Sequence, residues 1–195
     1  MKRRDVLVGG AGAVIGIAAT SVLQASRPAL ATGPERREGG AFEARLVALG
    51  IELPAAPAPV ATYVGWRRAG AVVYIAGQGP ADTVGQDAFG KLGHGLGIEG
   101  GYAAARGAAL NVLAQLRSAC GGSLDRVVQC LSITGYVNSA DDFTDQPAVL
   151  NGASDLFVEV FGEAGKAARA AIGVNTLPFG IAVEVESVWE VLSGD

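Results

Sequence analysis

Residue types that commonly build metal sites and catalytic triads are scarce in this sequence. Its 195 residues include two cysteines, one histidine and one methionine. The single histidine, His94, and the lack of any Cys/His cluster at ligand spacing exclude the usual zinc sites. No serine has an obvious histidine partner, which argues against a Ser-His-Asp hydrolase. We therefore expect no bound metal, and we interpret His94, in the stretch KLGHGLGIEGG, as a solvated loop residue.

Charge is also sparse. Charged residues make up 17% of the chain, whereas hydrophobic residues make up 50%. This composition supplies ample material for a packed core, and the length fits one domain with extra segments at its ends. The 29 glycines predict frequent loops and tight turns.

The N-terminus differs from the rest of the chain. It reads MKRRDVLVGGAGAVIGIAATSVLQASRPALATG, with a basic start, a weakly hydrophobic stretch and the A-x-A motif Ala29-Leu30-Ala31. The adjacent Arg3-Arg4 resembles a twin-arginine export signal. We predict that residues 1–31 are a cleaved signal peptide. The alternative is an uncleaved membrane anchor, because residues 6–25 are about long enough to span a bilayer.

Cleavage after Ala31 would leave a linker over residues 32–40 and a domain over 41–195. The mature protein would then be periplasmic or secreted, with no membrane attachment. An oxidising compartment permits a disulfide between Cys120 and Cys130. The alternative, which we favour, is two buried thiols, because one cysteine lies near a predicted helix end and the other inside a predicted strand.

The predicted mature chain is acidic. Removing residues 1–31 takes away four basic residues and one acidic residue, which lowers the formal net charge from −4 to −7. Proteins that bind nucleic acids use Lys and Arg to neutralise phosphates, so we predict no nucleic-acid partner. A small acidic ligand remains compatible with this charge, because one well-placed arginine outweighs a diffuse negative field at contact distance.

Hydrophobic periodicity predicts an α+β domain. The expected elements are a short helix over 42–49, strands near 62–68 and over 72–76, a helix over 99–119, a strand over 126–137, a helix beginning near Pro147, and a final hairpin turning at 177–180. Residues 79–100 show no sustained periodicity and predict a long loop. The order β-β-α-β-α-β-β, after the short helix, predicts a single sheet with two helices packed on one face. The other sheet face would need a partner subunit if it is apolar.

Four segments resemble, in order, those of the RidA/YjgF-like family of imine/enamine deaminases. The last, RAAIGVNTLP followed by VEVE, matches a family signature of an arginine, an alternating strand, Leu-Pro and a Val-Glu-Val-Glu strand. The arginine of that signature is Arg169. The segments APVATYVGW, YIAGQGP and DDFTDQPAVLNGASDLF resemble those that carry the family's active-site tyrosine, a backbone-binding glycine and an asparagine, here Tyr63, Gly77 and Asn151.

The resemblance implies a chorismate-mutase-like fold in a homotrimer with sites in clefts between subunits. It also implies hydrolysis of small 2-imino or enamine acids to 2-keto acids and ammonia, with no cofactor because a protonated imine is already electrophilic. Two positions depart from the family: Ala76 replaces a common serine and Ala171 a common cysteine, which removes thiol chemistry there. These departures and the long loop indicate a divergent, exported branch.

Strand alternation gives the matching residues a physical interpretation. Arg169 and Gly173 share one face of their strand. A tight turn at residues 177–180 would pair Gly173 with Glu184 and place Glu184 and Glu186 on the Arg169 face. We therefore expect a pocket floor with a cation at one end and carboxylates at the other. The alternative for Arg169 is a structural ion pair with Glu186. In either case we expect Glu186 to have a structural role.

The resemblance and the residue chemistry together predict a role for each site residue. Arg169 presents a planar fork that holds the substrate carboxylate. Glu184, with Tyr63, positions and deprotonates the attacking water. The backbone N–H near Gly77 fixes the substrate's orientation, and Asn151 lines the pocket.

Two other functions are compatible with the same family. The first is a non-catalytic, periplasmic small-molecule-binding or chaperone-like trimer that uses the same cleft without turnover. The second is ribonuclease activity, a label that the family has carried, against which the acidic charge and the lack of a catalytic histidine argue.

Overall fold

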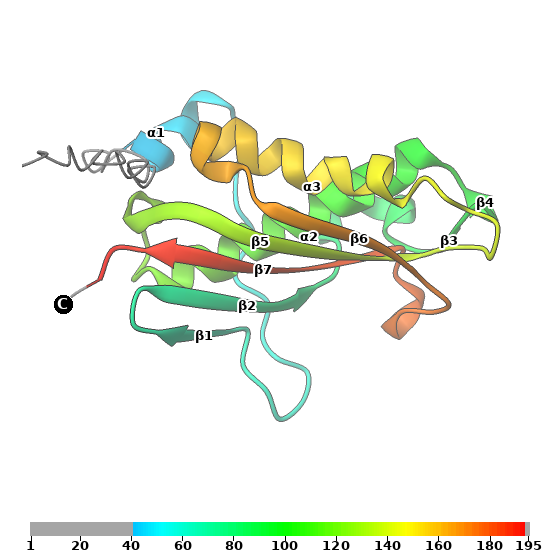
Figure 1. Ribbon diagram of the computed structural model, residues 1–195, viewed down its shortest axis with the longest axis horizontal. Coiled ribbons are helices and arrows are strands. Elements are labelled where there is room, and N and C mark those ends of the chain that lie inside the picture. Colours follow the sequence, from blue (N-terminus) through cyan, green and yellow to red (C-terminus); the bar gives the residue numbers. More distant parts are fainter. Residues whose placement is uncertain (1–40, 194–195) are drawn as a thin grey trace, which may run out of the picture. The chain divides into compact units, whose positions relative to one another are not determined.

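The computed structural model describes residues 41–193 (Figure 1). The predicted signal peptide over residues 1–31 and the linker over 32–40 lie outside the described residues. Within the described part, no helix is long and apolar enough to cross a membrane. The helices are α1 (Ala41–Ala48), α2 (Ile98–Ala119) and α3 (Gln146–Phe161), and the strands are β1 (Trp66–Ala69), β2 (Val72–Gln78), β3 (Lys91–Leu92), β4 (Gly95–Leu96), β5 (Val127–Asn138), β6 (Ala168–Val174) and β7 (Val183–Val191).

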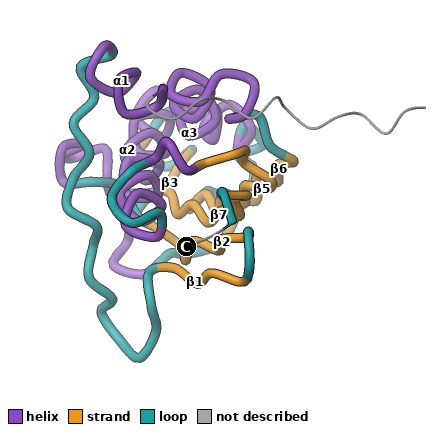
Figure 2. Tube along the Cα trace, turned by 90° about the vertical axis from the view of Figure 1, so that its left-hand side faces the viewer, coloured by secondary structure: helices purple, strands orange, loops and turns teal. Residues whose placement is uncertain are grey.

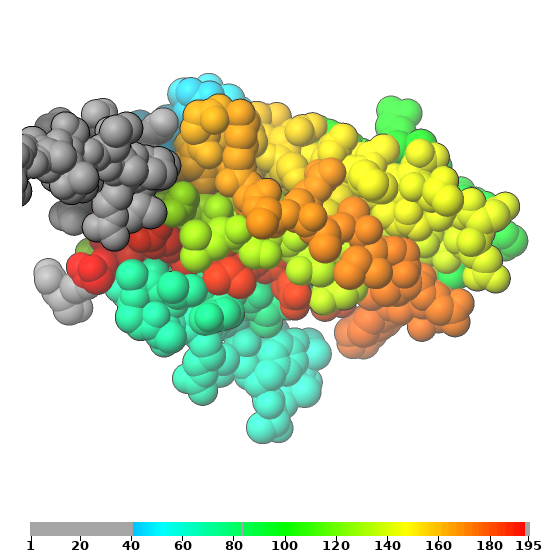
Figure 3. Space-filling view, in the orientation of Figure 1, coloured from blue at the N-terminus to red at the C-terminus, as the bar shows by residue number. Residues whose placement is uncertain are grey.

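Five strands form one sheet in the order β1-β2-β7-β5-β6. Strands β5 and β6 run parallel, whereas the other neighbouring pairs are antiparallel. Helices α2 and α3 lie on one side of the sheet (Figure 2), and no described helix covers the strands on the other side (Figure 3). We call this second side the open face. Apart from α1 and the short β3–β4 ladder, this arrangement confirms the predicted α+β class and element order.

Alternation along β7 explains how the sheet packs against the helices. Every second residue from Val183 to Val191 is buried, and the residues between are half-buried. The buried Trp189 ring contacts Phe157 and Phe161 of α3, with 5.1 Å between ring centroids in both pairs. The two helices also approach closely, because a Cβ at Gly152 of α3 would collide with the backbone of α2.

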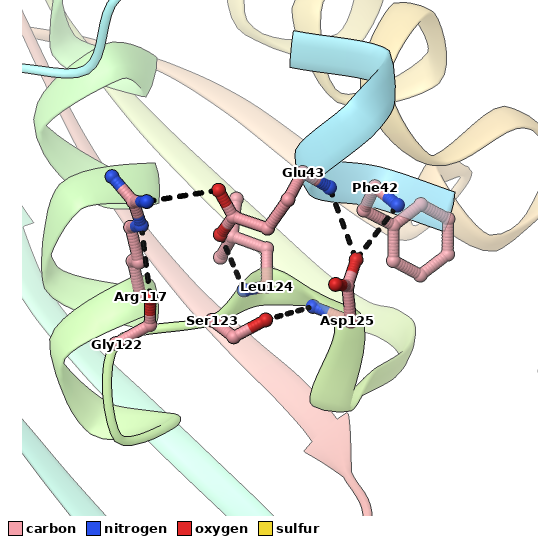
Figure 4. A network of polar contacts seen from close by, with 7 residues as sticks. All are labelled: Phe42, Glu43, Arg117, Gly122, Ser123, Leu124 and Asp125. Atoms are coloured by element: carbon pink, nitrogen blue, oxygen red, sulfur yellow. Dashed lines mark hydrogen bonds and ion pairs between the residues drawn. The ribbon is translucent and has the colours of Figure 1, made fainter. Parts of the chain in front are cut away.

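The predicted N-terminal helix exists as α1, and reciprocal polar contacts hold it to the turn before β5 (Figure 4). Asp125 Oδ1 accepts hydrogen bonds from the backbone N–H groups of Phe42 and Glu43, at 2.9 and 3.0 Å. In return, Glu43 accepts from the backbone N–H of Leu124 at 2.8 Å and forms an ion pair with Arg117 of α2. A carboxylate at these first N–H groups stabilises a helix N-terminus.

The C-terminal strands do not form the predicted hairpin. Strand β5 lies between β6 and β7 and pairs with both. Tyr136 of β5 is therefore opposite Ile172 on one side and Glu184 on the other. The predicted pairing of Gly173 with Glu184 is wrong. The turn residues between the strands show where the chain reverses, but they carry no information about a third strand that inserts between the two.

The segment over residues 79–100, predicted as a long loop, is built from short elements. It contains a 3₁₀ turn over Asp82–Ala88 and the two-residue strands β3 and β4. Lys91 Nζ donates to the backbone carbonyls of Ser139 and Asn175, which lie just beyond β5 and β6. This segment is therefore tied to the end of the sheet although its sequence lacks periodicity.

The two cysteines are free thiols in the core, as the favoured interpretation predicted. Cys120 and Cys130 are both buried and no bridge joins them. Burial raises the pKa of the Cys120 thiol to about 11 and that of Cys130 to about 12. Neither thiol is a candidate nucleophile, because the reactive form is the thiolate.

Candidate functional site

The five residues predicted to form the site lie in three separate places. Arg169 and Asn151 lie together where β6 meets α3. Glu184 of β7 and Gly77 of β2 lie against each other on the open face. Tyr63 lies in the loop before β1, with its ring half-exposed.

Arg169 stands on the edge strand β6 and reaches toward α3. Its Nη1 donates to Asn151 Oδ1 at 2.9 Å and to Ser154 Oγ at 3.0 Å. These bonds orient the guanidinium, while Nε and Nη2 make no hydrogen bond or ion pair within residues 41–193. The exposed guanidinium therefore keeps donors with which to bind a carboxylate. Ser154 was missed in the sequence, although it lies three residues after Asn151 and so on the same helix face.

Glu184 sits beside a β-bulge in strand β2. Two residues of β2, Ala76 and Gly77, face a single residue of β7 between the pairs Ile75–Ser187 and Gln78–Val185. A Cβ at position 77 would collide with the Glu184 carboxylate, so this close approach requires glycine. Burial, and then repulsion from Glu186, raises the pKa of Glu184. A half-buried carboxylate with a raised pKa is a stronger base than an exposed one.

Tyr136 lies beside the carboxylates of Glu184 and Glu186 and was not predicted from the sequence. It is directly opposite Glu184 in the β5–β7 register, and its Oη donates to Glu186 Oε1 at 3.1 Å. Desolvation, and then this hydrogen bond, raises the pKa of Tyr136. A usable signal existed in the sequence, because Ser132, Thr134 and Tyr136 recur at every second position of a predicted strand and so share one face.

A cavity of about 370 Å³ opens on the same face, beside Glu186. We call it the open-face cavity. It is lined by Val64, Trp66, Arg67, Tyr74, Ile75, Ala76, Ser132, Thr134, Glu186, Ser187 and Val188. Glu186, expected to be structural, therefore also lines a cavity.

The predicted pocket floor, with Arg169 and both glutamates on one face, is wrong for the single chain. Arg169 is paired with Ile133, whose side chain is buried on the helix side, whereas Glu186 is paired with Thr134 on the open face. The alternative for Arg169, an ion pair with Glu186, is accordingly absent from residues 41–193. The prediction placed Arg169 and the glutamates on one face because it paired β6 directly with β7. Since β5 lies between these strands, the register of each with β5 decides which face its side chains occupy, and the two sets lie on opposite faces.

Tyr63 is carried by a loop that a buried side chain of α2 holds in place. Strand β1 begins at Trp66, later than predicted, so Tyr63 precedes it. Gln115, with 4% of its surface exposed, donates from Nε2 to the carbonyl of Pro57 at 2.7 Å. Its amide also packs against Gly65, where a Cβ would collide with it. Gln115 thus contacts the loop on both sides of Tyr63.

Replacing Gln115 by leucine is expected to destabilise the protein by about 1–3 kcal/mol, because the buried amide and its part-buried hydrogen bond to the Pro57 carbonyl are lost while side-chain volume is kept. Denaturant unfolding measures this loss, and limited proteolysis reports opening of residues 57–65. The matched control is Gln129→Leu, which removes a half-buried bond to Glu190 and should cost less. Equal effects of the two substitutions would contradict the assigned role of Gln115.

No group of three His, Cys, Asp or Glu side chains in the described part of the chain is arranged to hold a metal ion. The chemistry available on the open face is that of carboxylates, the phenols of Tyr74 and Tyr136, hydroxyls and Arg67.

Comparisons with known proteins identify the family of the chain. Residues 43–186 match the family model described as YjgF/chorismate mutase-like, which also carries an endoribonuclease label. The chain is 46% identical over 153 residues to "Protein TCP17" of Trypanosoma cruzi, covering 78% of this chain and 95% of that protein. It is 29% identical to "RutC family protein PH0854" of Pyrococcus horikoshii, covering 68% and 90% of the two chains.

Among solved structures, the chain resembles the protein Atu1372 from Agrobacterium tumefaciens, whose function is unknown. The TM-score is 0.70 and the identity 35%, covering 78% of this chain and 94% of that one. The extent of the family match and the shared fold lead to one conclusion. The chain belongs to the YjgF/RidA-like family.

Proposed function

We propose that this protein hydrolyses small 2-imino or enamine acids to 2-keto acids and ammonia, at sites formed between the subunits of a homotrimer. One observation carries the proposal. Arg169 and Glu184 have the chemistry for this reaction, yet they lie on opposite sides of the sheet with β5 between their strands. A substrate that contacts both residues must therefore lie between two copies of the chain.

Exposed apolar side chains on the open face support an association of this kind. Tyr74 is 52% exposed and Ile172 is 43% exposed, and both lie on strands with no described helix above them. They lie on β2 and β6, on either side of β7 and β5, and apolar side chains exposed on one sheet face fit a protein contact there. A second copy that covers this face would bring its edge strand β6, with Arg169, toward the Glu184 of its neighbour.

The proposed reaction assigns a step to each residue. Arg169, oriented by Asn151 and Ser154, holds the substrate carboxylate. Glu184 removes a proton from water as the oxygen bonds to the imine carbon, which gives a tetrahedral aminoalcohol. The same carboxyl group returns the proton to nitrogen. As the C–N bond breaks and ammonia leaves, the carboxylate takes the hydroxyl proton, which forms the keto group, and ammonia carries that proton away as ammonium. An enamine substrate first takes a proton from solvent at its β-carbon to become the imine. The raised pKa of Glu184 favours its proton transfers near neutral pH.

A binding protein without turnover is the alternative. Ala76, which lines the open-face cavity, offers no side-chain hydrogen bond to a ligand, and a bound acid could be held by Arg169 alone. Timed release of ammonia from 2-iminobutyrate or 2-aminoacrylate, generated in situ, separates the two functions. A rate equal to that of buffer across several imino acids would leave only the binding role.

Complementation between two impaired variants tests the composite site. Arg169→Ala and Glu184→Gln chains should each have little activity alone, but an equal mixture assembled together should recover roughly one quarter of wild-type activity. Recovery follows because an equal, random mixture places an intact Arg169 beside an intact Glu184 at about one interface in four. The variants are dissociated together in denaturant, refolded, checked for oligomeric state by native mass spectrometry, and assayed.

Each variant refolded alone is the control for recovery caused by refolding itself. Mixed assemblies that form in the expected proportions yet stay inactive would show that both residues must act within one chain, which is contrary to the proposal.

A further inference from the structure

The open-face cavity, already defined by its lining residues, holds two charges of opposite sign that the proposed reaction does not use. Arg67 of β1 and Glu186 of β7 both line it, and no ion pair joins them in the described structure. Its volume of about 370 Å³ lies in the lower part of the range typical of small-molecule pockets. Glu184 is not among the lining residues.

The strand register separates the two charges across the cavity. Arg67 is opposite Tyr74, which is opposite Val188, whereas Glu186 lies one pleat further along β7. Two strand spacings and one pleat repeat place the two backbones about 12 Å apart. Both residues line the cavity between these backbones, and the gap suits a ligand of a few heavy atoms.

Arg67 lacks the contacts that hold its neighbour. Arg68, on the other side of the same strand, donates to the carbonyls of Gly70 and Leu192. The side chain of Arg67 makes no hydrogen bond or ion pair in the described part of the chain. Its guanidinium therefore presents a complete fork to whatever enters the cavity, and a carboxylate matches that fork.

Glu186 offers the opposite chemistry at the other wall. Its Oε1 accepts the hydrogen bond from Tyr136, which leaves Oε2 without a partner among the described residues. The hydroxyl groups of Ser132 and Thr134 lie on the same wall. An ammonium group would find an acceptor and a compensating charge at Oε2.

We propose that the open-face cavity binds a zwitterionic α-amino acid with an apolar side chain. The ligand's carboxylate binds Arg67 and its ammonium binds Glu186. Its side chain packs against Val64, Tyr74 and Val188, which form the apolar part of the lining. The site differs from the proposed reaction centre in its residues, and its occupancy requires no turnover. If a second copy covers the open face, the cavity becomes more enclosed and the two charged contacts become stronger.

Isothermal titration calorimetry of the full-length protein with L-leucine tests the proposal. Arg67→Gln and Glu186→Gln should each weaken binding by roughly 10- to 100-fold, which is the usual effect of losing one charged hydrogen bond. N-acetyl-L-leucine lacks the ammonium and L-leucinamide lacks the carboxylate, so both should bind as weakly to wild type as L-leucine binds to the variants. Arg169→Gln and Lys166→Gln, which remove cations outside the cavity, should bind L-leucine normally.

Several results would overturn the proposal. They are the absence of heat at millimolar L-leucine, equal binding of the N-acetyl compound, or a loss caused by Arg169→Gln rather than by Arg67→Gln. A change of oligomeric state in Arg67→Gln would also overturn it, because this cation would then serve a subunit contact. Absence of imine hydrolysis would leave all of these readouts unaffected, so failure of the proposed reaction is distinguishable from failure of this inference.

Discussion

Replacing Arg169 by alanine is expected to lower kcat/KM for 2-iminobutyrate by between about 30-fold and several-thousand-fold. The substitution removes a charged, two-pronged contact to the substrate carboxylate in a closed cleft. It also leaves Asn151 and Ser154 without the guanidinium that they orient. The measurement is timed ammonia release from imino acid generated in situ, with saturation of the enzyme by a 2-keto acid as a separate readout of binding.

The fold and assembly should survive this change, because Arg169 is exposed and makes no ion pair in the described structure. Lys166→Ala is the matched control: it removes an exposed cation three residues earlier, whose partner is Glu163, and should leave activity unchanged. The activity of Ser154→Ala should lie between those of Arg169→Ala and Lys166→Ala, because the bond to Asn151 still orients the guanidinium. An Arg169→Ala protein that is unfolded or monomeric would instead make the arginine a structural residue.

Replacing Glu184 by glutamine is expected to lower kcat by about 100- to 10,000-fold while binding of a 2-keto acid survives. Glutamine keeps the shape that fits against Gly77 but cannot take a proton from water. Stopped-flow measurement of turnover, together with calorimetric binding of 2-oxobutyrate, separates the two effects. Wild-type activity in this variant would leave Tyr63 or a substrate-held water as the base.

The same substitution should increase stability near neutral pH. Burial, and then Glu186, raises the pKa of Glu184 in the folded state above the value of about 4.3 expected in the unfolded chain. Between these two values the folded state binds more protons than the unfolded state, so wild-type stability falls as pH rises through this window. Glu184→Gln has no such loss. Its advantage in Tm should therefore be present at pH 7 and disappear below the unfolded pKa.

A melting difference that stays constant from acid to neutral pH would contradict the raised pKa, because it would have to come from packing. Glu190→Gln is a suitable control on the same strand. Its carboxylate accepts a hydrogen bond from Gln129 and lies at the far end of β7 from Glu184.

Local chemistry in the sequence determined most of the secondary structure. Apolar residues at helical spacing located α2, Pro147 marked the first turn of α3, and alternation from Val183 located β7. These patterns involve residues a few positions apart, so they can be recognised without knowledge of the fold. Family resemblance added Arg169 and Asn151, which the structure brings within hydrogen-bonding distance.

The tertiary structure alone decided which side chains of different strands share a face of the sheet. Alternation correctly grouped Arg169 with Gly173 and Glu184 with Glu186, but it assigned the two groups to one face. The side that a group faces depends on the strand beside it, and β5 enters between β6 and β7 from 30 or more residues away in the chain. Pairing over such a separation leaves no local signal.

The two charged residues of the open-face cavity also show what the sequence predicts and what only the tertiary structure determines. The sequence indicated that both residues lie on strands, because Arg67 precedes the Ala69-Gly70 turn of a predicted hairpin and Glu186 lies in the alternating stretch VEVE. Only the order β1-β2-β7 made them face one cavity, although 118 positions separate them in the chain. Strands pair through backbone hydrogen bonds, which do not depend on the identity of the side chains. The sequence around Arg67 or Glu186 therefore does not predict which distant residue lies across the sheet from it.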